Sequence, residues 1–235
     1  AQNIPFGGAS YSSARIRTLG SFEVRYGRIE ARIKLPKGQG LWPAFWMLPT
    51  NSPYGGWASS GEMDIMESVN QMNRIHGTLH FGSPWPSNTS AGGTLQDGRD
   101  FSQDFHVYSM DWNPDSISWS VDGEVYRTIG SGAWFSSAAT GNPRAPFDTP
   151  FHILLNVAVG GNFPGDPNGT ASFPQEMVVD WVRVYREQQA AYSGAEHAIP
   201  GRIEAEDFDA GYPDEAYQDC DAGNNGGAYR PDSDV

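Results

Sequence analysis

Three carboxylates lie close together in the sequence SGEMDIME at positions 60–67. Side chains alternate along a regular strand, so Glu62 and Asp64 would share one face while Glu67 would point to the other, apolar face. Burying an unpaired carboxylate among apolar side chains is costly. We therefore predict a β-bulge between Asp64 and Glu67, which returns Glu67 to the face that carries the other two acids.

Such a group of acids suits the hydrolysis of a glycosidic bond. Neighbouring carboxylates repel one another, so at least one should keep its proton to a higher pH than usual. Glycosidic cleavage needs this difference, because one carboxyl group protonates the leaving oxygen while an ionised one acts on the opposite side of the sugar. A separation of about 5–5.5 Å would let the ionised group attack carbon, with retention of configuration. We hypothesise that Glu62 and Glu67 converge to such a spacing.

Nearby tryptophans favour a sugar-binding role for this segment. A run of acids on a strand face is usually just solvated, and that alternative stays open for the motif taken alone. Trp42, Trp46 and Trp57 precede the motif, and flat indole rings stack well on the apolar faces of sugars. Three further tryptophans have apolar strand neighbours and are expected in the core: Trp112, Trp119 and Trp181.

Two histidines follow on the next predicted strand. His76, Thr78 and His80 alternate with apolar residues and should share one face. His80 is the better candidate for a contact with Asp64 or a bound sugar, although a structural role stays open for both histidines. No pairing of histidines with carboxylates has the spacing of a catalytic metal site. We therefore expect catalysis to require no cofactor.

The elements that must position these residues are predicted to be strands. Patterns typical of strands occur at 22–35, 41–48, 151–159 and 177–185. Residues 113–129 predict a hairpin with Asp122-Gly123 as its turn. No amphipathic helix is evident. The pattern predicts antiparallel sheets packed face to face, an all-β sandwich or jelly roll.

Composition limits the partners of the chain. Its 235 residues carry a net charge of −13, and the 15 basic residues are scattered. This balance argues against nucleic acid and anionic membranes as partners. No run of about 18 apolar residues is present that could span a membrane. The single cysteine, Cys220, cannot form an internal disulfide, so cysteine content does not identify a compartment.

We expect three parts along the chain. A catalytic domain at 1–187 is followed by a linker of small and polar residues at 188–198. Residues 199–235 are then the start of a further unit. Residues 199–235 hold ten acidic residues against two basic ones, which marks a change of composition.

Three motifs resemble glycoside hydrolase family sixteen, in particular its laminarinase-like endo-1,3-β-glucanases. They are GEMDIME at 61–67, GLWPAFWM at 40–47 and VAVGGN at 157–162. The resemblance covers roughly residues 10–186. It implies a concanavalin A-like jelly roll with a concave substrate cleft.

The resemblance also implies roles for the acids. Glu62 would be the nucleophile, Asp64 an assisting acid and Glu67 the acid/base. Members of the family carry further strands ahead of the part that resembles Tyr11, so we expect the N-terminal part of the catalytic domain to be missing. Many relatives bind a structural calcium through that part, and here only Asp180 would remain as a ligand.

The segment from 199 to 227 resembles the start of a family six carbohydrate-binding module. Glu204 and Glu206 match positions that hold a structural calcium in such modules. The segment stops short of a whole module, so we expect a fragment of a longer, secreted and monomeric enzyme.

Three alternatives to a β-1,3-glucanase stay open. Mixed-linkage β-glucan, or the red-algal galactans agar and carrageenan, could replace the substrate while fold and mechanism are kept. A non-catalytic lectin would use the tryptophans but not the pair of glutamates. Transglycosylation is the third, because sugar instead of water can intercept a covalent intermediate.

Overall fold

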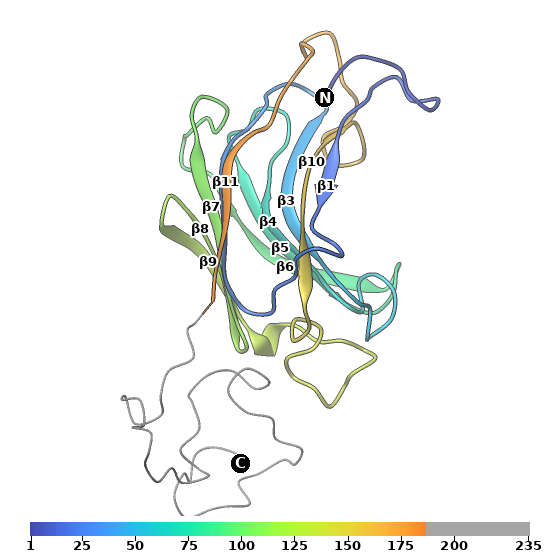
Figure 1. Ribbon diagram of the computed structural model, residues 1–235, viewed down its shortest axis with the longest axis vertical. Helices are drawn as coiled ribbons and strands as arrows, with labels where there is room; N and C mark the ends of the chain where they lie inside the picture. Colours follow the sequence, from blue (N-terminus) through green and yellow to red (C-terminus); the bar gives the residue numbers. More distant parts are fainter. Residues whose placement is uncertain (187–235) are drawn as a thin grey trace, which may run out of the picture. The chain divides into compact units, whose positions relative to one another are not determined.

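The computed structural model describes residues 1–186, which form two antiparallel sheets that lie face to face (Figure 1). Residues Ala1–Tyr185 form one compact unit. The predictions for the linker at 188–198 and for 199–235, with Glu204, Glu206 and Cys220, lie outside the described residues.

The first sheet has six strands in the order β1-β10-β3-β4-β5-β6. Their bounds are β1 Arg15–Arg17, β3 Leu41–Pro49, β4 Glu62–Glu67, β5 Ile75–Gly82, β6 Asn88–Leu95 and β10 Phe151–Val159. The second sheet has five strands in the order β11-β2-β7-β8-β9. Their bounds are β2 Gly27–Lys34, β7 His106–Asn113, β8 Ser116–Val121, β9 Glu124–Gly130 and β11 Val178–Tyr185. The all-β jelly-roll sandwich predicted from the sequence is confirmed.

Helical structure is nearly absent from residues 1–186. They contain a single 3₁₀ turn, η1 Ser131–Ala133, and no α-helix. None of the described residues forms a helix long and apolar enough to cross a bilayer.

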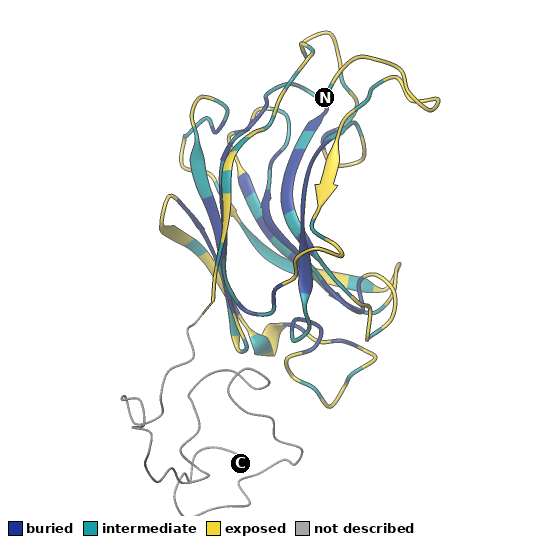
Figure 2. Ribbon diagram, in the orientation of Figure 1, coloured by how far each residue is buried: buried dark blue, intermediate teal, exposed yellow. Residues whose placement is uncertain are grey.

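The core lies between the two sheets. Along β2, Ile29, Ala31 and Ile33 are fully buried, as the alternation predicts, and β3 and β10 are buried along most of their length (Figure 2). The predicted core residues Trp112 and Trp119 are also fully buried. The other face of the first sheet does not contribute to this core, so its side chains can form a site.

Two sequence predictions about strands need correction. The strand expected at 22–35 begins only at Gly27, because Tyr26 has a φ of 62° and Gly27 a φ of 116°, which interrupt the extended chain. Trp181 is only half-buried, because it lies on the edge strand β11, which pairs with β2 alone. The guanidinium of Arg183 lies 4.2 Å from the centre of its ring.

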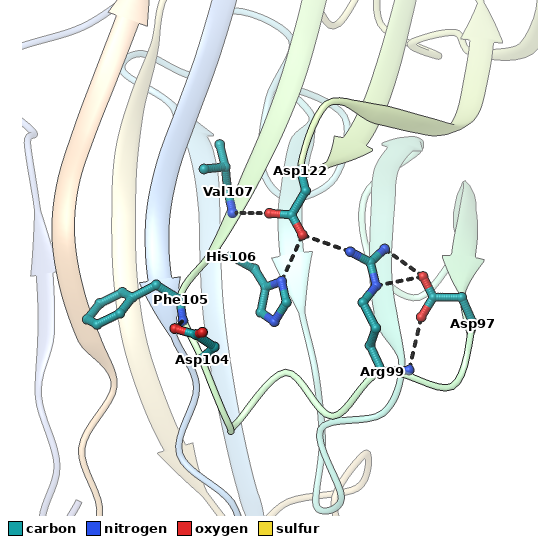
Figure 3. Close-up of polar contacts among 7 residues, drawn as sticks. All are labelled: Asp97, Arg99, Asp104, Phe105, His106, Val107 and Asp122. Carbon is teal, nitrogen blue, oxygen red and sulfur yellow. Dashed lines mark hydrogen bonds and ion pairs between the residues drawn. The ribbon is translucent and has the colours of Figure 1, made fainter.

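The predicted turn between β8 and β9 is confirmed, and its aspartate fastens neighbouring segments. Asp122 has a φ of 52° and Gly123 a φ of 85°, as a two-residue hairpin turn requires. The Asp122 carboxylate accepts hydrogen bonds from the backbone N–H of Val107 at 2.9 Å and from Arg99 at 2.7 Å (Figure 3). His106 Nδ1 lies 2.8 Å from the same carboxylate. This network ties the hairpin to β7 and to the preceding loop.

Candidate active site

A β-bulge places all three acids of the motif on one face of β4. Asp64 pairs with Thr78 and Glu67 with His76, so two residues of β4 face only Gly77 of β5. Met63, Ile65 and Met66 point into the core and are at most 1% exposed. The predicted bulge between Asp64 and Glu67 is therefore confirmed.

A tryptophan of the second sheet contacts the bulge from the core side. The indole Nε1–H of Trp119 on β8 donates a 2.8 Å hydrogen bond to the backbone carbonyl of Asp64. Gly77 makes room for this indole, because a Cβ at that position would lie 2.4 Å from the Trp119 ring. Without Trp119, the carbonyl of Asp64 would lose a buried hydrogen-bond donor at the irregular point of the strand.

The acids line a small cavity on the outer face of the first sheet. Its volume is about 130 Å³. The lining residues are Arg15, Trp42, Ala44, Trp46, Glu62, Asp64, Glu67, Asn156 and Ala158. Glu62 and Glu67 therefore meet in one cavity, as the hypothesis of a paired site requires.

The cavity continues on both sides. A pocket of about 280 Å³ beside Trp57 and His152 shares Arg15 and Glu62 with it. Another of about 460 Å³ shares Ala158 with it. The acids thus lie in the middle of an extended depression rather than at a closed end.

Two of the predicted substrate-binding tryptophans hold the glutamates directly. The Nε1–H of Trp57 donates to Glu62 Oε2 at 2.6 Å, and the Nε1–H of Trp42 donates to Glu67 Oε1 at 2.9 Å. Trp57 lies in the loop between β3 and β4, and Trp42 lies on β3, so the two carboxylates are held by different segments. Hydrogen bonds to an ionised carboxylate also favour its charged form.

The third tryptophan, Trp46, lies between two residues that the sequence analysis did not single out. Its Nε1–H donates to Asn156 Oδ1 at 2.8 Å, and the guanidinium of Arg15 lies 5.1 Å from its ring centre. Arg15 and Asn156 come from β1 and β10, which pair next to β3. Local sequence carries no signal for this neighbourhood, because Asn156 lies more than a hundred positions from both Trp46 and Arg15.

Asp64 is the most enclosed of the three acids, with 2% of its surface exposed. Its Oδ2 has no hydrogen-bond donor and lies 3.3 Å from His80 Nε2. The ring of His80 lies 5.5 Å from that of Trp57. The predicted contact between His80 and Asp64 is present, and His80 also lies beside the tryptophan that holds Glu62.

Burial raises the pKa of all three carboxyl groups. Burial and the charge of Asp64 raise the pKa of Glu62 to about 8, against the opposing effects of His80 and the Trp57 N–H. Burial and the charge of Glu67 raise the pKa of Asp64 well above its usual value. Burial also raises the pKa of Glu67, although the Trp42 N–H and His80 act in the other direction. Glu62, with a pKa of about 8, therefore keeps its proton at neutral pH, as predicted for at least one of the three acids.

His76 and Asp180 lie apart from this group. His76 Nδ1 lies 2.9 Å from Thr94 Oγ1, and its ring packs edge-on against Phe163. Asp180 forms an ion pair with Arg32 at 2.6 Å. Among residues 1–186, one group of three His, Cys, Asp or Glu side chains lies close enough together to hold a metal ion: Glu62, Asp64 and His80. Asp180 is not part of this group. Calcium binding at Asp180 stays a prediction.

The site contains a basic residue that the sequence analysis did not place there. The motif at 60–67 itself contains no basic residue, but Arg15 lines the same cavity. The strand β1 brings it there by pairing with β10 through Arg15 and Asn156. A three-residue strand gives too short a pattern for this pairing to be predicted.

Known proteins share the sequence pattern and the fold of this chain. Residues 2–183 match Glycosyl hydrolases family 16. Glucan endo-1,3-beta-glucosidase A1 of Niallia circulans is 49% identical over 184 residues, which cover 77% of this chain and 27% of that protein. A beta-1,3-glucan-binding protein of Penaeus monodon is 43% identical over 185 residues, which cover 69% of this chain and 50% of that protein.

A solved structure is similar over most of the described fold. The laminarinase from Rhodothermus marinus superposes with a TM-score of 0.70 at 38% sequence identity, covering 79% of this chain and 75% of that one. The family match spans well over half of the 235 residues and includes the bulged strand with its three acids. The chain therefore belongs to glycoside hydrolase family 16.

Proposed function

We propose that this chain hydrolyses internal β-1,3-glucosidic bonds of a β-glucan with retention of configuration. The observation that carries the proposal is the meeting of Glu62 and Glu67 in one cavity, each held by its own indole N–H. The names of the Niallia circulans and Rhodothermus marinus relatives support the choice of β-1,3-glucan. The depression that extends to both sides of the acids supports attack within a chain rather than at its end.

In the first step, Glu67 acts as the acid and Glu62 as the nucleophile. Glu67 gives its proton to the glycosidic oxygen, while a Glu62 oxygen attacks the anomeric carbon. The carbon–oxygen bond to the leaving sugar breaks, and its electron pair stays on that oxygen. The products are a shortened glucan and a glycosyl ester on Glu62, with Glu67 ionised.

In the second step, water releases the sugar. Glu67, now a base, takes a proton from a water molecule whose oxygen attacks the anomeric carbon. The ester bond breaks and its electron pair returns to Glu62. Two displacements at the same carbon restore the original configuration, and Glu67 regains its proton.

Asp64 takes the proton that Glu62 must give up before it attacks. Burial and the charge of Glu67 raise the pKa of Asp64, which favours its protonated form. Transfer of the proton to Asp64 removes the charge that raises the pKa of Glu62. The Trp57 N–H stabilises the Glu62 carboxylate through its hydrogen bond. The mechanism requires this transfer, because Glu62, with a pKa of about 8, is protonated at neutral pH in the free protein.

The test is the release of reducing ends from laminarin, lichenan and agarose. We expect release from laminarin with a mixture of oligosaccharides at early times, as internal cleavage produces. Preferential release from lichenan or agarose would replace the substrate, and sugar transfer products at high oligosaccharide concentration would add transglycosylation. No release from any polymer, with laminarin still bound, would favour the lectin and contradict the proposed hydrolysis. Secretion and a monomeric state stay predictions of the same proposal.

A further inference from the structure

A second exposed tryptophan, Trp85, lies next to the proposed site and has no part in the mechanism. Its surface is 72% exposed, the highest value among the exposed tryptophans of residues 1–186. The centre of its ring lies 6.3 Å from that of Trp57, with the two planes 41° apart. Trp57 itself is 40% exposed and donates its N–H to Glu62. The indole of Trp85 is thus the direct neighbour of Trp57, which holds the carboxylate of Glu62.

The position of Trp85 is fixed by its backbone. The N–H of Trp85 donates a 3.0 Å hydrogen bond to the carbonyl of Trp57. The loop after β5 is held further by the backbone N–H of Ser137, which donates to the carbonyl of Gly82 at 2.9 Å. Ser136 in turn donates its hydroxyl to the carbonyl of Ser59 at 2.8 Å. Hydrogen bonds therefore connect three loops to one another, and they fix the backbone that carries the exposed indole.

A solvent-exposed indole beside a sugar cleft has a simple use. A single exposed apolar side chain needs no explanation, but two neighbouring indoles form a continuous aromatic surface that begins at the site. Indole rings cover the C–H faces of sugars and lose little side-chain entropy on binding. The spacing of the Trp57 and Trp85 rings is comparable to the length of one sugar unit of a polysaccharide.

We propose that Trp85 forms an outer sugar-binding subsite, in which its ring stacks on a unit of the glucan beyond the one that contacts Trp57. This inference rests on the proposed function, because its ligand is the same β-glucan chain. The subsite lengthens the stretch of polymer that the cleft grips. It affects binding of long chains and leaves the reacting atoms untouched.

The variant Trp85→Ala tests this directly, because it removes the ring and keeps the backbone bond to Trp57. We expect KM for laminarin to rise roughly 3- to 10-fold, as loss of one aromatic stacking contact implies, with kcat nearly unchanged. The shortest laminari-oligosaccharides that are cleaved should show a smaller rise. Trp85→Phe should restore most of the affinity, because a ring is again present. Trp181→Ala on β11 is the matched control and should leave KM unchanged.

The outcomes separate the subsite from the proposed function. If wild-type protein releases no reducing ends from any β-glucan, the proposed function fails. If wild-type protein is active and Trp85→Ala leaves KM for laminarin unchanged, the subsite is refuted and the function stands. An equal loss of kcat/KM on long and short substrates would also refute the subsite, because it would show a structural role. Titration of the inactive Glu62→Gln variant with laminari-oligosaccharides gives the same answer without turnover: Trp85→Ala in that background should weaken binding of long oligosaccharides selectively.

Discussion

The indole of Trp119 donates a hydrogen bond to the backbone carbonyl of Asp64, across the interior of the sandwich and at the bulge of β4. This bond joins the second sheet to the irregular point that turns Glu67 toward Glu62. We expect Trp119→Phe to destabilise the fold by about 1–3 kcal/mol, because a buried carbonyl loses its donor. It should also lower kcat, because the spacing of the glutamates is no longer fixed. Urea unfolding and laminarin hydrolysis measure the two effects.

Trp112→Phe is the matched control for this prediction. Trp112 is equally buried and donates its N–H to the carbonyl of Phe147 rather than to the bulge of β4. The variant should lose similar stability and keep its kcat. Equal kcat in both variants would show that Trp119 has no special role in positioning the acids.

Gly77 should not tolerate a side chain. An added Cβ would lie 2.4 Å from the Trp119 ring, and that ring is fully buried and cannot move aside freely. We expect Gly77→Ala to destabilise the fold by about 1–3 kcal/mol and to reduce activity. Gly132 has open space around it and no positive φ, so Gly132→Ala should behave like wild type. A wild-type melting temperature for Gly77→Ala would mean that the packing described for the bulge is wrong.

The two glutamates should be indispensable and Asp64 less so. We expect Glu67→Gln to lower kcat by about 10²- to 10⁴-fold, the usual range for losing a general acid/base, and Glu62→Gln to lower it at least as much. Asp64→Asn should be less severe, because an amide can still donate a hydrogen bond to Glu62. Binding of laminarin should stay measurable in all three variants. Full activity in either glutamate variant would remove that residue from the mechanism.

The charge of Glu62 should make the folded protein less stable as the pH rises. Its pKa is about 8 in the fold against a usual value of 4.5, so the folded protein binds more protons than the unfolded chain between these values. The contribution of Glu62 to stability is therefore greatest below about pH 4.5 and falls as pH rises toward 8. Glu62→Gln removes this charge, and its amide oxygen can still accept the N–H of Trp57. At pH 8 we expect the free energy of unfolding of the variant to exceed that of wild type by about 1 kcal/mol or more, with a higher melting temperature. Near pH 4 the two proteins should be equally stable. A lower melting temperature at pH 8 would contradict the buried charge.

The two indole N–H groups should act on opposite limbs of the pH profile. Trp57→Phe removes a hydrogen bond that lowers the pKa of Glu62, so the pKa rises and the acid limb of kcat/KM moves to higher pH. Trp42→Phe removes the corresponding bond to Glu67, so the pKa of the acid rises and the alkaline limb moves to higher pH. The reverse assignment of limbs would exchange the roles of the two glutamates.

The bulge could be predicted because parity along a strand is a local property. Glu62 and Glu67 are an odd number of residues apart, and the cost of burying one of them required an irregular strand. The two-residue turn at Asp122-Gly123 was equally local. The contacts of the tryptophans were not predictable in this way, because the bonds of Trp42 and Trp57 to the glutamates depend on strand pairing and loop shape.

Long-range pairing also explains what was missed. Arg15 and Asn156 reach the cavity only because β1 pairs with β10 and β10 with β3. Trp181 was expected in the core because its neighbours are apolar, but its strand lies at a sheet edge. Sequence periodicity shows which residues share a face, and it does not show which strand covers that face.

Trapping of the covalent intermediate tests whether Glu62 is the nucleophile. A 2-deoxy-2-fluoro β-laminari-oligosaccharide with an activated leaving group should react with the protein and accumulate as an ester, which mass spectrometry of the digested protein locates. We expect one label per chain, carried by the Glu62 side chain, and β-configured sugar as the first product of turnover. A label on Glu67, or first release of the α-anomer with no label, would contradict this expectation.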